Sequence, residues 1–92
     1  MKGCTFDEFK QVVKSGWEIT FTVRGTDFYY ERLTVGNTST AHMSHLEDKN
    51  PFFNKHFNDD DTLLEEVLAL PILGDQTLVD LQDEIEVNRM VK

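Results

Sequence analysis

The chain has 92 residues, a formal net charge of −8, 39% hydrophobic residues and a single cysteine. This length suffices for one modest core, so we expect residues 1–92 to form a single α+β domain. No apolar run approaches the roughly 20 residues that cross a bilayer, and the first residues do not resemble a signal peptide. We therefore expect a cytoplasmic protein that does not bind membranes. The single cysteine excludes an internal disulfide, which agrees with a reducing compartment.

Local patterns predict a helix and a strand at the start of the chain. Thr5 and Glu8 fit a capping box, and apolar residues at helical spacing follow, so a helix is expected over Phe6–Lys14. The segment Trp17–Val23 alternates apolar and polar residues, which is typical of a strand with one buried face.

Two further strands complete a predicted meander. Residues 28–35 are rich in aromatic and β-branched residues and follow a glycine turn. Their alternation is less regular, because Phe28, Tyr29 and Tyr30 are consecutive and must point to both faces. Residues 38–45 are predicted as the third strand, and residues 46–61 as a polar connection whose phenylalanines pack onto the core.

Residues 61–86 are predicted to form two short acidic helices, with a connector at residues 71–75. Pro71 ends the first helix because proline cannot donate to the helical ladder. Residues 87–92 fit either an extension of the second helix or an edge strand. The fold class expected is therefore α+β, with an N-terminal helix, a three-stranded antiparallel meander, and two C-terminal acidic helices packed on one sheet face. The expected inner positions of these two helices are Leu63, Leu64, Val67, Leu68, Leu78, Leu81 and Ile85.

The sequence contains no recognisable catalytic or cofactor-binding motif. The histidines could be combined with the aspartates at residues 59–61 into a metal site, but His42 and His45 are three residues apart and would point to opposite sides of a strand. Cys4 precedes a helix N-terminus, where the pKa of a thiol can fall, but nothing places a histidine beside it. We therefore expect no enzymatic activity, no metal and no cofactor.

The acidic residues are concentrated in the last third of the chain. Residues 1–57 hold seven acids and seven bases, whereas residues 58–92 hold ten acids and two bases. Direct binding to nucleic acid is not expected, because it needs clustered lysine and arginine. The acidic surface is either a solvated face that keeps the protein soluble or a patch that docks into a basic groove of a partner protein. The candidate partner-binding residues are Glu65, Glu66, Asp80, Asp83, Glu84 and Glu86.

The chain also contains T-F-D-E-F-K at residues 5–10, G-W-E-I-T-F at residues 16–21, L-P-I-L-G-D-Q-T-L at residues 70–78 and D-E-I-E at residues 83–86. With these segments it resembles small bacterial and prophage proteins to which no function is assigned. The resemblance implies an α+β fold and a mobile-element setting, and it transfers no catalytic residues.

Taken together, these features predict a non-enzymatic acidic protein-interaction domain. The most specific version of this hypothesis is an inhibitor of the anti-CRISPR type, encoded by a phage or another mobile element. Such an inhibitor mimics nucleic acid and blocks a nucleic-acid-binding factor. The alternative is a bacterial regulatory or housekeeping domain that binds a protein or a small ligand through its aromatic sheet.

Overall fold

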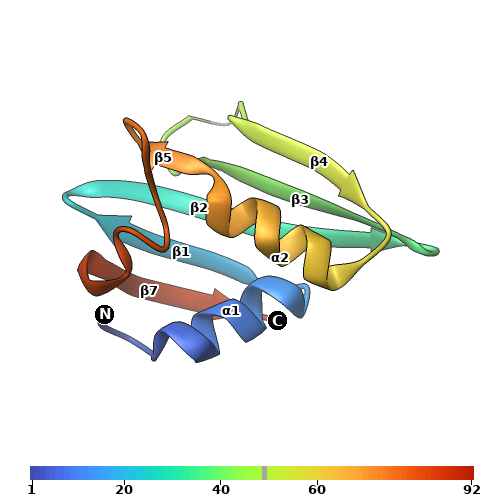
Figure 1. Cartoon of the computed structure of the whole chain (residues 1–92), viewed down its shortest axis with the longest axis horizontal. Coiled ribbons are helices and arrows are strands. Elements are labelled where there is room, and N and C mark those ends of the chain that lie inside the picture. Colours follow the sequence, from blue (N-terminus) through green and yellow to red (C-terminus); the bar gives the residue numbers. More distant parts are fainter. Residues whose placement is uncertain (49) are drawn as a thin grey trace.

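The computed structural model describes residues 1–48 and 50–92. Its centre is a five-stranded antiparallel sheet in the order β4-β3-β2-β1-β7, and α1 and α2 lie across one face of this sheet (Figure 1). The ribbon β5-β6 and the 3-10 turn η1 connect α2 to the last strand. The elements are α1 (Phe6–Lys14), β1 (Glu18–Val23), β2 (Thr26–Val35), β3 (Thr38–His45), β4 (Phe53–Phe57), α2 (Asp60–Ala69), β5 (Pro71–Leu73), β6 (Gln76–Thr77), η1 (Gln82–Glu84) and β7 (Ile85–Val91).

The predicted architecture is wrong in its number of strands and in its last helix. We expected three strands followed by two helices, whereas in the described residues the main sheet has five strands and α2 is the only α-helix after the meander. Residues 53–57 were expected in a polar connection but pair with β3 as β4. Residues 85–91 pair with β1 as β7, so the edge-strand alternative for the tail is the one that the fold adopts.

The apolar residues expected on the inner side of the last helix are buried, but they do not form a helix. Leu78 and Leu81 are fully buried, and Ile85 is 1% exposed. Thr77 and Asp80 do exchange cap-like hydrogen bonds, from the Thr77 N–H to Asp80 Oδ2 (3.0 Å) and from the Asp80 N–H to Thr77 Oγ1 (3.2 Å). The turn then continues only into η1, because the residues from Ile85 onward alternate and cover the edge of β1 that would otherwise be unpaired.

The hairpin between β1 and β2 is determined locally. Arg24 and Gly25 form its two-residue loop, with φ angles of 50° and 78°. Positive φ at both central positions is the type I′ geometry, whose twist matches that of the flanking strands. The loop sets a register in which Phe21 lies opposite Phe28, and so it places aromatic side chains of both strands on the same face.

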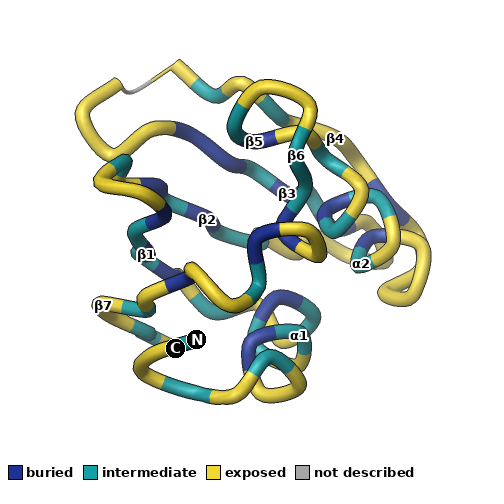
Figure 2. The backbone as a smooth tube through the Cα atoms, turned by 60° about the vertical axis from the view of Figure 1, so that its left-hand side comes forward, coloured by how far each residue is buried: buried dark blue, intermediate teal, exposed yellow. Residues whose placement is uncertain are grey.

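The core lies between the sheet and the helices, and the buried residues gather on the strands and on the inner sides of α1 and α2 (Figure 2). Phe9 of α1 meets Phe21 edge-on with ring centroids 5.5 Å apart, and Phe21 stacks on Phe28 at 5.3 Å. The Tyr30 hydroxyl donates to the Val13 carbonyl (3.0 Å), which satisfies a polar atom that the packing would otherwise leave buried alone. These contacts fix α1 against the sheet.

The first residues extend the sheet beyond β7. Lys2 makes a parallel bridge with Glu86, in which the Lys2 N–H donates to the Ile85 carbonyl and the Val87 N–H donates to the Lys2 carbonyl, both at 2.9 Å. Gly3 follows with a φ of 94°, and a Cβ atom there would lie 2.6 Å from the Val87 carbonyl oxygen. Only glycine allows the backbone to approach β7 this closely.

Gly3→Ala should therefore destabilise the protein more than Gly25→Ala does. Both positions have positive φ, but nothing lies within 4 Å of a Cβ atom at Gly25. We expect Gly25→Ala to cost about 1 kcal/mol, and Gly3→Ala about 2–4 kcal/mol because a clash adds to the unfavourable φ. Urea denaturation of the two variants measures the difference. Equal losses would show that the close approach to Val87 does not constrain the fold.

Candidate functional site

The fold brings bases from the first part of the chain onto acids of its last third. Lys14 pairs with Asp61 (2.9 Å) and Arg32 with Asp60 (2.7 Å), and two further pairs join Arg24 to Glu84 and Lys55 to Glu66. Much of the local charge excess seen in the sequence is thereby neutralised.

Three of the six predicted partner-binding residues have structural partners. Glu66 pairs with Lys55 of β4, and Asp80 accepts the Thr77 N–H. Glu84 accepts two hydrogen bonds from the Arg24 guanidinium, from Nε and Nη2, each at 2.8 Å. Their carboxylates are already engaged within the chain.

The other three, Glu65, Asp83 and Glu86, are exposed on different elements. Glu65 lies on α2 and Asp83 in η1, whereas Glu86 lies on β7 opposite Thr22 of β1. Since β4 and β7 are opposite edges of the sheet, Glu66 beside β4 and Glu86 on β7 are separated by the whole sheet. The structure does not assemble the six predicted residues into one helical face.

The Arg24–Glu84 pair provides a test of these electrostatics. The hydrogen bonds from Arg24 hold the pKa of Glu84 below the ordinary glutamate value. Arg24→Gln should raise this pKa towards the ordinary value, which an NMR titration of the carboxyl carbon would measure. Because the folded pKa is the lower one, the stabilisation by ionised Glu84 is present above its unfolded pKa and is lost as the pH falls through the folded pKa. An unchanged pKa in the variant would contradict the pairing.

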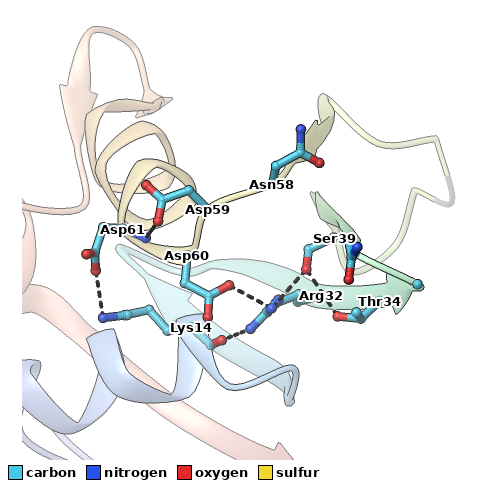
Figure 3. Close-up of a pocket in the computed structure, with 10 residues that line it drawn as sticks. Lys14, Arg32, Thr34, Ser39, Asn58, Asp59, Asp60 and Asp61 are labelled. Carbon is cyan, nitrogen blue, oxygen red and sulfur yellow. Dashed lines mark hydrogen bonds and ion pairs between the residues drawn. The ribbon is translucent and has the colours of Figure 1, made fainter.

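A polar hollow of about 540 Å³ opens where the C-terminus of α1, the β2–β3 turn and the N-terminus of α2 meet (Figure 3). Arg32 crosses its floor, and its side chain is only 13% exposed. Nη2 contacts Asp60 Oδ1 (2.7 Å) and donates to Ser39 Oγ (2.8 Å), while Nη1 donates to the Lys14 carbonyl. One guanidinium thus joins four elements.

The helix termini explain why a cation occupies this position. The last carbonyls of α1 have no intrahelical donor, and a positive charge is favourable at that end of the helix. At the other side, Asp59 caps α2 by accepting the backbone N–H groups of Asp61 and Thr62, and the bonds from Thr62 lower the pKa of Asp59. The charged groups of the hollow pair with one another, although the buried Arg32 Nε has no hydrogen-bond partner among the described residues. The ion pairs indicate that the primary role of the hollow is structural.

Arg32→Met should destabilise the fold by about 2–4 kcal/mol, because it leaves Asp60, Ser39 and the Lys14 carbonyl without their shared donor. Lys10→Met is the matched control, since it removes an ion pair with Asp7 whose partners are 33% and 91% exposed, and should cost less than about 1 kcal/mol. Chemical denaturation measures both values. Similar small losses would argue against a structural role for Arg32.

The histidines and the cysteine do not converge. His42 and His56 lie on the face of the sheet opposite the helices, whereas His45 packs between Phe28 and Phe52 with ring centroids 5.2 and 5.1 Å away. The described residues hold no group of three or more His, Cys, Asp or Glu side chains arranged to bind a metal ion. The pKa of Cys4 is raised, first by burial and then by Glu8, which disfavours the thiolate form.

The open face of the sheet, opposite the helices, carries a polar cluster that the sequence analysis missed. The Tyr29 hydroxyl donates to Glu31 Oε2 (2.8 Å), and the pKa of Tyr29 is raised by burial and by the neighbouring carboxylates of Glu31 and Glu18. A small hollow of about 110 Å³ lies beside Tyr29. It is lined by Tyr29, by Glu18 and Thr20 of β1, and by Arg89 and Val91 of β7. The run of three aromatic residues at positions 28–30 obscured which of them faces outwards; the pairing of Tyr29 with Thr20 decides it.

Comparisons of the chain with protein-family models, curated proteins and solved structures gave no match. The resemblance inferred from the sequence segments therefore remains a prediction. Within the described residues, no helix has the length and hydropathy needed to cross a membrane.

Proposed function

We propose that this protein is a non-enzymatic acidic interaction domain whose partner is a protein with a basic surface. The observation that carries the proposal is the commitment of Lys14, Arg24, Arg32 and Lys55 to ion pairs within the chain. These bases are tied to the fold, and the net charge of −8 is left on carboxylates elsewhere on the surface. Such a surface attracts a basic partner and repels nucleic acid.

The finer form of the proposal is an inhibitor of a nucleic-acid-binding factor, encoded by a phage or another mobile element and of the anti-CRISPR type. Support comes from the small size of the chain and its negative charge, which would compete with a nucleic-acid backbone for a basic groove. This role would place the protein in the cytoplasm.

The alternative, a regulatory or housekeeping domain that binds a ligand through an aromatic sheet, has less support. Phe21, Phe28 and Tyr30 are fully buried beneath the helices and present no surface to a ligand. Tyr29 is the aromatic side chain of β2 that points to the open face, and its hydroxyl is already bonded to Glu31.

The proposal predicts salt-sensitive binding that depends on exposed carboxylates. In a pull-down from the native host followed by titration of the purified pair, a double variant with Asp83→Lys and Glu86→Lys should bind about tenfold more weakly or worse at low salt. The affinity of the native protein should fall steadily as salt is added. Glu66 and Glu84 are left intact because they form ion pairs that support the fold.

The matched control carries Asp7→Lys and Glu47→Lys, which change the net charge by the same amount at other exposed positions. If both double variants bind as the native protein does and salt has no effect, the interaction is not electrostatic and the proposal fails. If both variants lose binding equally, total charge rather than these two residues governs the affinity.

A further inference from the structure

The face of the sheet opposite the helices carries a row of acidic and aliphatic side chains. Along the central strand β2, the side chains on this face are, in order, Asp27, Tyr29, Glu31, Leu33 and Val35, which we call the β2 stripe. Because both helices and the buried leucines after β6 belong to the core on the other face, no helix covers the stripe in the described part of the chain. It is a continuous acidic and aliphatic row on an uncovered sheet.

The carboxylates of the stripe are oriented without being neutralised. The Thr22 hydroxyl donates to Asp27 Oδ1 (2.5 Å), and the Tyr29 hydroxyl donates to Glu31 Oε2 (2.8 Å). Hydroxyl groups restrict the rotamers of both acids but leave their negative charge in place. In the described residues neither acid has an ion-pair partner, in contrast to Asp60 and Asp61 beside the helices. Ordering before binding lowers the entropic cost of binding a cation.

The aliphatic end of the stripe is exposed. Leu33 is 55% and Val35 is 83% exposed, and they are neighbours on the same face of the same strand. Single exposed aliphatic residues are common, but two beside a pair of oriented carboxylates can supply apolar contact area next to electrostatic attraction.

These observations identify the chemistry of the occupant. We infer that the β2 stripe is a docking surface for an extended segment of a partner protein that carries lysine or arginine residues followed by aliphatic residues. The side chains of the stripe repeat every second residue, at the spacing that an extended segment also presents. This inference rests on the proposed function, because it specifies where the basic partner binds and in what conformation.

A second copy of the chain fits the stripe poorly. Stacking two open faces would bring Asp27 and Glu31 of one copy against like charges of the other, which disfavours association. Arg89 lies on this face on the edge strand β7 and lines the small hollow beside Tyr29, but among the described residues it forms no ion pair with Asp27 or Glu31.

The test uses a defined probe, the peptide Lys-Thr-Tyr-Thr-Lys-Thr-Val-Thr-Val, with a second peptide in which glutamate replaces both lysines. Backbone amide NMR of the whole protein should show shifts confined to β2 and its neighbours β1 and β3 on adding the lysine peptide. The glutamate peptide should cause none. Asp27→Asn with Glu31→Gln, and separately Leu33→Thr with Val35→Thr, should each weaken binding about tenfold.

The control variant carries Asp7→Asn and Asp75→Asn, which remove two exposed carboxylates on α1 and in the β5–β6 turn, and it should bind the lysine peptide as the native protein does. Thermal melting of every variant verifies that it is folded. If the peptide instead shifts residues around Glu65 or Asp83, the docking inference fails while the proposed acidic function stands. If no basic peptide binds at low salt, both fail. Sedimentation that shows a dimer disrupted by Leu33→Thr with Val35→Thr would overturn the choice of partner in favour of a second copy.

Discussion

Because α1 and α2 pack on the same face of the sheet, the strands bury most of their apolar side chains on that face, and this one-sided burial governs the rest of the structure. It brings Phe9 edge-on against Phe21 and stacks Phe21 on Phe28, and it leaves the outward side chains of the same strands in water. A sheet covered on both faces would have used apolar residues throughout, and no polar row along β2 would remain.

The same arrangement determines where charge is neutralised. At the helix termini, where partial charges of the backbone are concentrated, Arg32 and Lys14 meet Asp60 and Asp61, and the charges cancel within the fold. On the open face, the carboxylate of Glu31 is held by a hydroxyl group instead and keeps its charge. The tertiary fold therefore decides which carboxylates keep their charge, and Glu31 lies outside the acidic segment at residues 61–86 that stands out in the sequence.

Sequence patterns predicted those elements whose determinants are close together in the chain. The capping box of Thr5 and Glu8 forms as expected, and the β1–β2 hairpin follows from alternation and from the Arg24-Gly25 loop. The prediction of the last helix was wrong for the opposite reason. Spacings of three and four at Leu78, Leu81 and Ile85 fit a helix, but burial requires only that these side chains point inwards, and an irregular loop achieves this as well.

The candidate site was the least predictable part, because ion pairs between distant residues and the face on which each side chain lies depend on register. By itself, the sequence determined α1, the alternating strands of the meander and the total charge, since these follow from local spacing and composition. Only the tertiary structure decided that the tail pairs with β1, that Arg32 joins both helices, and that Asp27 and Glu31 remain as oriented charges. Each of those outcomes requires contacts between segments that are far apart in the chain, which no local pattern encodes.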